Sequence, residues 1–192
     1  SCPNGNSNWV SSATTDYDGD GCRDSTEDND DDNDGVSDVD DACSAGDLGW
    51  TSNQATTDHD SDGCQDSSED LDDDNDGVAD LFPDDCQTGD LGWTSTSATD
   101  HDSDGCQDSS VEDSDDDNDG LQDTYDSCPM GDIGWTPSNT TDYDADGCQD
   151  VLEDLDDDND GFVDYDDDCS TGDLGWTSTS ATDYDADGCR DA

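Results

Sequence analysis

The chain has no lysine and only two basic residues, Arg23 and Arg190, against 60 acidic residues. Its formal charge of −58 gives a surface that repels the phosphate backbone of nucleic acids, so we expect no nucleic-acid partner. A chain with so little positive charge would repel itself and stay expanded unless cations from outside neutralise it.

Apolar residues are also scarce. They make up 26% of the 192 residues, and this share includes ten cysteines. An ordinary hydrophobic core cannot be built from this supply. There is no long apolar run, so we expect no membrane span. The composition predicts either a disordered polyanion or a fold held by metal ions and disulfides.

Residues that mark catalytic sites are nearly absent. The sequence shows no nucleophile–base set, catalytic metal site or phosphate-binding loop, so we expect no enzymatic activity. It contains two histidines and no Cys-x-x-Cys, which argues against zinc. His59 and His101 each occupy the second position of an acidic loop, where we expect them to face solvent.

What the chain does have is a repeated acidic motif. Asp-x-Asp-x-Asp-Gly occurs nine times, each time with another Asp three residues after the Gly. This is the ligand spacing of a twelve-residue calcium loop, in which positions 1, 3, 5, 9 and 12 carry carboxylates and position 7 offers a carbonyl. Gly stands at position 6 in all nine copies, which a merely disordered acidic chain would not require. Oxygen-only ligands in such number favour Ca²⁺ over Mg²⁺.

Five of these loops, the A loops, carry Cys at position 7. In the third A loop Val111 stands at position 12, and Glu112 is taken as the last ligand across a one-residue insertion. The candidate ligands, with the Cys residues contributing carbonyls, are Asp16, Asp18, Asp20, Cys22, Asp24 and Glu27; Asp58, Asp60, Asp62, Cys64, Asp66 and Glu69; Asp100, Asp102, Asp104, Cys106, Asp108 and Glu112; Asp142, Asp144, Asp146, Cys148, Asp150 and Glu153; and Asp183, Asp185, Asp187, Cys189 and Asp191.

The other four, the B loops, contain Asp-Asp-Asp-Asn-Asp-Gly. In the second B loop Pro83 stands at position 12, and Asp84 is taken as the ligand instead. The candidate ligands, with Val, Leu and Phe contributing carbonyls, are Asp30, Asp32, Asp34, Val36, Asp38 and Asp41; Asp72, Asp74, Asp76, Val78, Asp80 and Asp84; Asp115, Asp117, Asp119, Leu121, Asp123 and Asp126; and Asp156, Asp158, Asp160, Phe162, Asp164 and Asp167.

The loops recur with a period near 42 residues, which predicts a linear array. Each unit has a Trp segment from its first Cys, then an A loop and a B loop. The units span residues 1–42, 43–85, 86–127, 128–168 and, in part, 169–192. Because the last unit stops within an A loop, we expect a mature product or an excerpt whose array continues. Gly, Asp, Asn, Ser and Thr predict a mostly irregular chain, with single helical turns and short strand pairings at most.

The ten cysteines at regular intervals predict disulfides in an oxidising, extracellular setting. Two pairings compete. Pairing across the Trp segment leaves no orphan and varies less in separation, so we expect it: Cys2–Cys22, Cys43–Cys64, Cys86–Cys106, Cys128–Cys148 and Cys169–Cys189. Pairing across the two acidic loops, as in Cys22–Cys43, is the alternative and strands Cys2 and Cys189.

Charge neutralisation supplies the folding free energy that apolar burial cannot. Nine Ca²⁺ would change −58 to −40, and two per loop would change it to −22. The A and B loops nearly abut, because Glu69 ends one loop, Asp70 is extra and Asp72 begins the next. We therefore expect about nine or more Ca²⁺ per chain, with some carboxylates bridging two ions.

The series Asp-x-Asp-x-Asp-Gly-x-x-Asp-x-x-Asp, ending in Cys128-Pro129 and resuming with a Cys-bearing loop, resembles thrombospondin type 3 repeats, most of all the long bacterial and archaeal arrays. The resemblance covers all 192 residues. It implies an aperiodic fold around a Ca²⁺ core, disulfides between successive loops, and an extracellular adhesive or structural role. The 42-residue unit and its Gly-Trp-Thr-Ser segment depart from that family, and dockerins, which share the spacing, add helices not predicted here.

These observations predict a calcium-rigidified extracellular spacer, stalk or protomer of a surface filament. Homopolymer neighbours are the expected partners, with O-glycans on the Ser/Thr clusters, such as Thr94–Thr99 and Thr177–Thr182, and an N-glycan at Asn139. Two alternatives remain. One is an adhesin that binds glycans through its Trp segments, whose tryptophans otherwise pack on the disulfides; the other is a calcium-buffering or mineral-nucleating polyanion.

Overall fold

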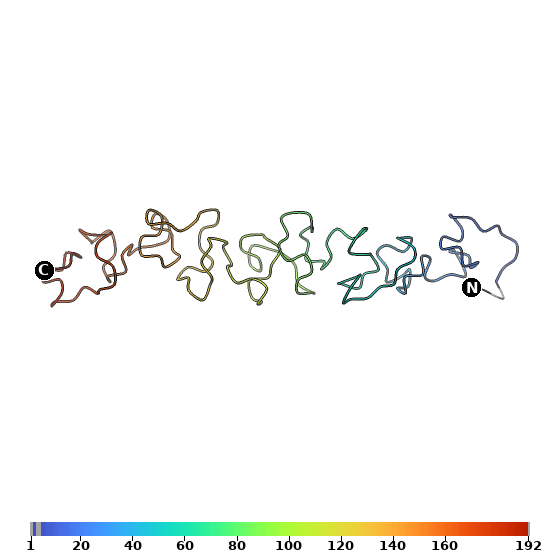
Figure 1. Ribbon diagram of the computed structural model, residues 1–192, viewed down its shortest axis with the longest axis horizontal. Coiled ribbons are helices and arrows are strands. Elements are labelled where there is room, and N and C mark those ends of the chain that lie inside the picture. Colours follow the sequence, from blue (N-terminus) through green and yellow to red (C-terminus); the bar gives the residue numbers. More distant parts are fainter. Residues whose placement is uncertain (1, 3–4, 192) are drawn as a thin grey trace. The chain divides into compact units, whose positions relative to one another are not determined.

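A computed structural model describes residue 2 and residues 5–191. None of these residues lies in a helix or a strand, and Figure 1 accordingly shows neither coiled ribbon nor arrow. Turns and bends carry the backbone throughout. The prediction of an irregular chain with little regular secondary structure is confirmed. In the described residues the loops are closed by isolated hydrogen bonds rather than by strand pairings.

The chain divides into two compact units. Unit 1 comprises Ser1–Ser95 with Asp104–Cys106, and unit 2 comprises Thr96–Ser103 with Gln107–Ala192. Three disulfides lie in unit 1 and two in unit 2, each joining residues of the same unit.

All ten cysteines are paired across the Trp segments. The bonds are Cys2–Cys22, Cys43–Cys64, Cys86–Cys106, Cys128–Cys148 and Cys169–Cys189, with Cα–Cα distances of 5.1–5.2 Å. The predicted pairing is confirmed and the alternative across the acidic loops is wrong. On the chain-entropy model, closing a loop of about 20 residues contributes roughly 3 kcal/mol to stability.

The interior is made of carboxylates. Among the described residues, the buried apolar side chains are disulfide cysteines, namely Cys22, Cys64, Cys106 and Cys148. Seventeen aspartates are buried with them, eleven of these at under 2% exposure. Large apolar side chains lie outside, as at Val39, Leu81 and Val111, which are 89–99% exposed. The usual distribution of polar and apolar groups is therefore reversed.

Each acidic loop is closed at its base by its own backbone. The N–H at position 9 donates to the carbonyl of the residue just before the loop, as from Asp38 to Asn29 (2.9 Å) and from Asp164 to Leu155 (2.9 Å). Within the loop the backbone takes a left-handed conformation at positions 4 and 6. In the first B loop these are Asn33 (φ 59°) and Gly35 (φ 102°). Asn tolerates this conformation better than most residues, which accounts for Asn at position 4 of every B loop.

The side chain at position 2 of the A loops reaches into the next sequence unit. Tyr17 donates its hydroxyl to the Gly46 carbonyl at 2.9 Å, and Tyr143 does the same to Gly172 at 2.8 Å. In the second loop, Nε2 of His59 lies 2.9 Å from the Gly89 carbonyl. His101 makes the equivalent contact with Gly131 at 2.8 Å. The expectation that His59 and His101 face solvent is therefore wrong, because both rings are half-buried. Each ring acts as a strut, meaning a side chain that bonds its A loop to the next sequence repeat.

The two one-residue insertions are accommodated at the surface. Val111 is 99% exposed, and Glu112 then accepts a hydrogen bond from the Gln107 N–H, as Glu69 does from Gln65 and Glu153 from Gln149. In the second B loop, Phe82 is 88% exposed. Asp84 then occupies the place of position 12, and its Oδ1 accepts from the Cys86 N–H at 2.7 Å.

Candidate metal-binding sites

The first B loop holds the carboxylates at positions 1 and 5 by one oxygen each and leaves the other oxygen without a protein partner. In the first B loop, Oδ2 of Asp30 accepts from the Gly35 N–H at 3.2 Å, and Oδ1 of Asp34 accepts from the Val36 N–H at 2.7 Å. The remaining oxygens, Oδ1 of Asp30 and Oδ2 of Asp34, are buried and accept no hydrogen bond. A buried carboxylate oxygen is costly unless something positive meets it.

Position 12 of each B loop repeats this arrangement. Oδ1 of Asp41 accepts from the Cys43 N–H at 2.6 Å, while its Oδ2 is buried without a partner. The equivalent Oδ2 atoms are orphaned in the same way in Asp84, Asp126 and Asp167. Positions 1, 5 and 12 of the first B loop thus each present one unsatisfied oxygen, and Asp30, Asp32 and Asp34 bring ligand atoms within 4.8 Å of one another. This donor set fits a hard cation such as Ca²⁺.

The carboxylate at position 3 of each B loop is also anchored from the next sequence unit. Oδ2 of Asp32 accepts from the Gly46 N–H at 2.8 Å. The same bond recurs from Gly89 to Asp74, from Gly131 to Asp117 and from Gly172 to Asp158. The turn after the first Cys of a Trp segment therefore fixes a predicted ligand of the loop before it.

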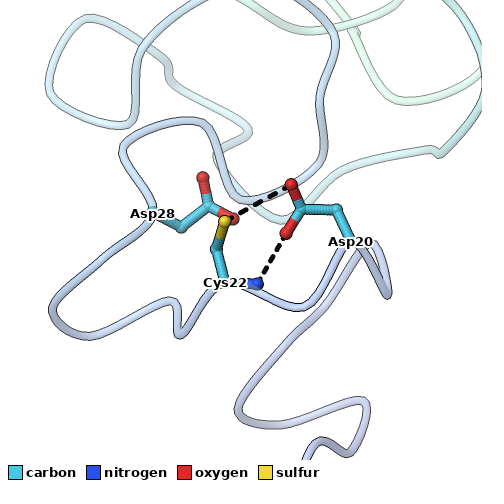
Figure 2. Close-up of side chains that lie close together, drawn as sticks. All are labelled: Asp20, Cys22 and Asp28. Atoms are coloured by element: carbon cyan, nitrogen blue, oxygen red, sulfur yellow. Dashed lines mark hydrogen bonds between the residues drawn. The ribbon is translucent and has the colours of Figure 1, made fainter. Parts of the chain in front are cut away.

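The first three carboxylates of the A loops also converge. Ligand atoms of Asp16, Asp18 and Asp20 lie within 4.8 Å of one another, as do those of Asp58, Asp60 and Asp62. Figure 2 shows the carboxylates of Asp20 and Asp28 beside Cys22, whose N–H donates to Oδ1 of Asp20 at 2.7 Å. Cys22 Sγ belongs to a disulfide and has no proton or free thiolate, so oxygen atoms remain the metal donors here.

The glutamates at position 12 of the A loops contact backbone amides. Oε1 of Glu69 accepts from the Gln65 N–H at 3.2 Å, and Oε2 accepts from the Asp47 N–H at 2.8 Å in the adjoining Trp segment. Glu153 makes the same pair of bonds with Gln149 and Asp132. These side chains join the A loop to its disulfide-linked turn.

The carboxylate at position 9 ties back to its own loop by one oxygen. Oδ1 of Asp66 accepts from the His59 N–H at 3.0 Å, and Oδ1 of Asp80 accepts from the Asp73 N–H at 3.0 Å. This bond to the position-2 N–H is present in all nine loops. Ligand atoms of Asp66 lie within 4.8 Å of those of Asp70 and Asp73, which sequence reasoning did not select. The sequence contains one sign of this cluster, because every B loop has Asp at its position 2 and another Asp two residues before its start.

The A and B loops of a repeat are further joined by the Asn at position 4 of the B loop. Its side-chain amide donates to the carboxylate at position 3 of the preceding A loop. The pairs are Asn33–Asp18, Asn75–Asp60, Asn118–Asp102 and Asn159–Asp144. A B-loop backbone position selected for its left-handed conformation therefore also orients a predicted ligand of the A loop.

Burial and mutual repulsion shift the acidity of these groups. Burial, together with repulsion from Asp80 and Asp66, raises the pKa of Asp73 to about 7. The pKa values of Asp116 and Asp157 are raised to about 7 by burial and by the equivalent neighbours. Burial likewise raises the pKa of Asp41, Asp84 and Asp126 to about 6. Without added cations, these carboxylates thus hold their protons to a higher pH than an ordinary aspartate.

Comparison with known proteins gives no assignment, since no protein-family model and no curated protein matches this chain. Across the described residues there is also no helix of the length and apolar character needed to cross a bilayer. The site's own chemistry therefore carries the functional argument.

Proposed function

We propose that this chain is an extracellular calcium-binding structural protein, a spacer, stalk or filament protomer whose interior is made of bound cations. In this proposal the nine loops hold Ca²⁺ through the carboxylates and position-7 carbonyls of a linear tandem array. The resemblance to thrombospondin type 3 repeats agrees with it, although no family model matches.

One observation carries the proposal: the described chain buries seventeen aspartates and, among apolar side chains, only disulfide cysteines. Taking an unpaired carboxylate out of water costs several kcal/mol. Arg23 and Arg190 are the only arginine or lysine residues, and two positive charges are too few to neutralise this interior. Bound divalent ions supply the missing charge at a place where the protein already offers orphaned oxygens.

The oxygen-only donor set selects among metals. Its carboxylates are numerous and come from flexible loops, which suits the six to eight ligands of Ca²⁺ better than the strict octahedron of Mg²⁺. All five pairs of cysteines are oxidised, as expected of proteins in an oxidising extracellular compartment. Asn139 is exposed, which makes it a suitable acceptor for the proposed N-glycan.

Two structural features favour a structural role over the alternatives. A simple calcium buffer does not need a disulfide in every repeat, or carboxylates fixed through one oxygen by backbone amides. The tryptophans are half-buried, and the indole nitrogens of Trp50, Trp93, Trp135 and Trp176 are buried rather than available to a glycan. The burial of these indole groups supports a packing role for the tryptophans within the Trp segment.

The proposal is tested by counting bound Ca²⁺ and measuring the chain's dimensions together. We expect at least nine Ca²⁺ per chain by atomic emission, and a large, reversible increase in hydrodynamic radius after chelation. A calcium-saturated chain with the dimensions of a random coil would support the buffer instead. A compact chain whose hydrodynamic radius does not change on chelation would refute the cation-based interior.

A further inference from the structure

We propose a second class of calcium site, distinct from the nine loops, at the junction between the A loop and the B loop of each of the first four repeats. Its ligands are the position-9 aspartates of both loops, the aspartate two residues before the B loop, and the aspartate at position 2 of the B loop. In the second repeat these are Asp66, Asp80, Asp70 and Asp73, and the inference rests on the proposed function.

The geometry is clearest in the second repeat. Ligand atoms of Asp66, Asp70 and Asp73 lie within 4.8 Å of one another. These three carboxylates and Asp80 line a cavity of about 310 Å³ at the base of the two loops. That space accommodates a cation together with water molecules that complete its coordination.

Backbone amides hold three of these four carboxylates by one oxygen. Oδ1 of Asp66 accepts from the His59 N–H, and Oδ1 of Asp80 accepts from the Asp73 N–H, both at 3.0 Å. Oδ1 of Asp70 accepts from the N–H groups of Leu71 (2.7 Å) and Asp72 (3.1 Å). Carboxylates fixed in this way need little reordering to bind an ion.

The second oxygens point to a ligand independently of the clustering. Asp73 is only 9% exposed, and its Oδ1 is buried without a hydrogen-bond partner. Oδ2 of Asp70 is orphaned in the same way. With Arg23 and Arg190 as the only basic side chains in the sequence, no lysine or arginine is supplied for this pocket. A buried anionic oxygen in such a position calls for a cation.

The same atom is orphaned at all four junctions. Oδ1 of the position-2 aspartate is buried without a partner in Asp31, Asp73, Asp116 and Asp157. The position-9 carboxylates flanking it are anchored to position-2 amides in every case. No A loop carries Asp at position 2, so this residue belongs to the junction rather than to the loop motif. One junction per repeat brings the expected total from nine to thirteen Ca²⁺.

The test removes the junction ligand that no loop uses. A quadruple variant, Asp31→Asn, Asp73→Asn, Asp116→Asn and Asp157→Asn, is titrated with calcium alone beside the native chain. Its matched control, Asp40→Asn, Asp85→Asn, Asp166→Asn and Asp168→Asn, makes the same charge change at exposed aspartates. We expect thirteen Ca²⁺ for the native chain and the control, and nine for the junction variant, at unchanged hydrodynamic radius in saturating calcium.

The outcomes separate this inference from the proposed function. A native stoichiometry of nine, or a junction variant that still binds thirteen, overturns the junction site and leaves the loop sites standing. A native chain that binds no calcium overturns both. If the quadruple variant does not reach the native radius, the single change Asp73→Asn decides: loss of one Ca²⁺ supports the site, and no loss refutes it.

Discussion

At the scale of single residues, the fold depends on backbone positions that only small or specially tolerant residues can occupy. Gly63, at position 6 of the second A loop, has φ 89°, and a Cβ there would overlap the carboxylate of Asp41 from the preceding B loop. Gly92 has a similar φ of 84° but open space around it. The two positions therefore separate backbone strain from steric conflict.

We expect Gly63→Ala to lower stability more than Gly92→Ala. Both changes impose a left-handed conformation on a residue with a Cβ, which costs about 1–2 kcal/mol. Only the first also displaces Asp41, which is a predicted calcium ligand. Thermal unfolding in saturating calcium measures the difference, and equal losses for the two variants would contradict the assigned contact.

The raised pKa values predict how the chain responds to pH without calcium. A buried aspartate whose folded pKa is about 7 binds a proton more readily in the folded than in the unfolded chain, where the value is near 3.8. Its contribution to stability is therefore present at about pH 4 and is lost as the pH rises through 6 to 7.

We accordingly expect the metal-stripped chain to be more compact at pH 4 than at pH 7.5, and calcium to restore compactness at pH 7.5. Dynamic light scattering across this range measures the change. A metal-stripped chain with one radius at both pH values would show that these carboxylates do not control the fold.

At the scale of elements, the loops and Trp segments are joined by a few recurrent contacts. The position-2 strut uses Tyr17 and Tyr143 in the first and fourth repeats, and His59 and His101 in the second and third. A Tyr hydroxyl and a His ring N–H thus bond to the carbonyl of the equivalent glycine in successive repeats. The natural sequence therefore already exchanges Tyr and His at position 2 of its A loops while keeping this hydrogen bond.

We expect His59→Ala to destabilise the chain by about 0.5–1.5 kcal/mol, the net value of one hydrogen bond. His59→Tyr should retain most of that stability, because Tyr17 makes the same contact. Chemical denaturation at fixed calcium measures both variants. Equal destabilisation by Ala and Tyr would mean that the bond to Gly89 contributes nothing.

Much of this element structure was predictable from the sequence. The acidic spacing located the loops, and the regular cysteine intervals indicated the correct disulfides. The struts and the inter-loop junction were not predicted. The side chain at position 2 has no role within one loop. Its contacts, such as that of His59 with Gly89 and that of Asp73 with Asp66, depend on how neighbouring segments fold together. The A-loop glutamates were similarly read as ligands within one loop, whereas Glu69 also bonds to Asp47 in the Trp segment.

At the scale of the whole molecule, the proposed function makes folding and metal binding a single equilibrium. Among the described residues the buried apolar side chains are disulfide cysteines, so on the proposed function removal of calcium would leave the disulfides as the main constraint on a chain of charge −58. Cys22, Cys64, Cys106 and Cys148 are buried at 5–6% exposure in the folded chain. If calcium holds this fold together, it should therefore also protect the disulfides from reductants.

We expect a soluble dithiol to reduce the disulfides much faster after chelation than in saturating calcium. Thiol titration against time measures the rate, with unchanged ionic strength as the control. Equal rates would show that the buried cysteines are reached without disturbing the acidic loops.

The placement of the disulfides also decides how this polypeptide would respond to mechanical tension. Force passing along the backbone from one linked pair to the next crosses each S–S bond, so the segment that the bond encloses, with its cysteines 20 or 21 positions apart, bears no load. Only the backbone between two disulfides, such as residues 22–43, can lengthen under load, and it extends to at most about 70 Å. On the proposed function, that stretch is held folded by its bound ions. Stretching would then remove metal from the protein in steps, and the disulfides would limit the length of each step.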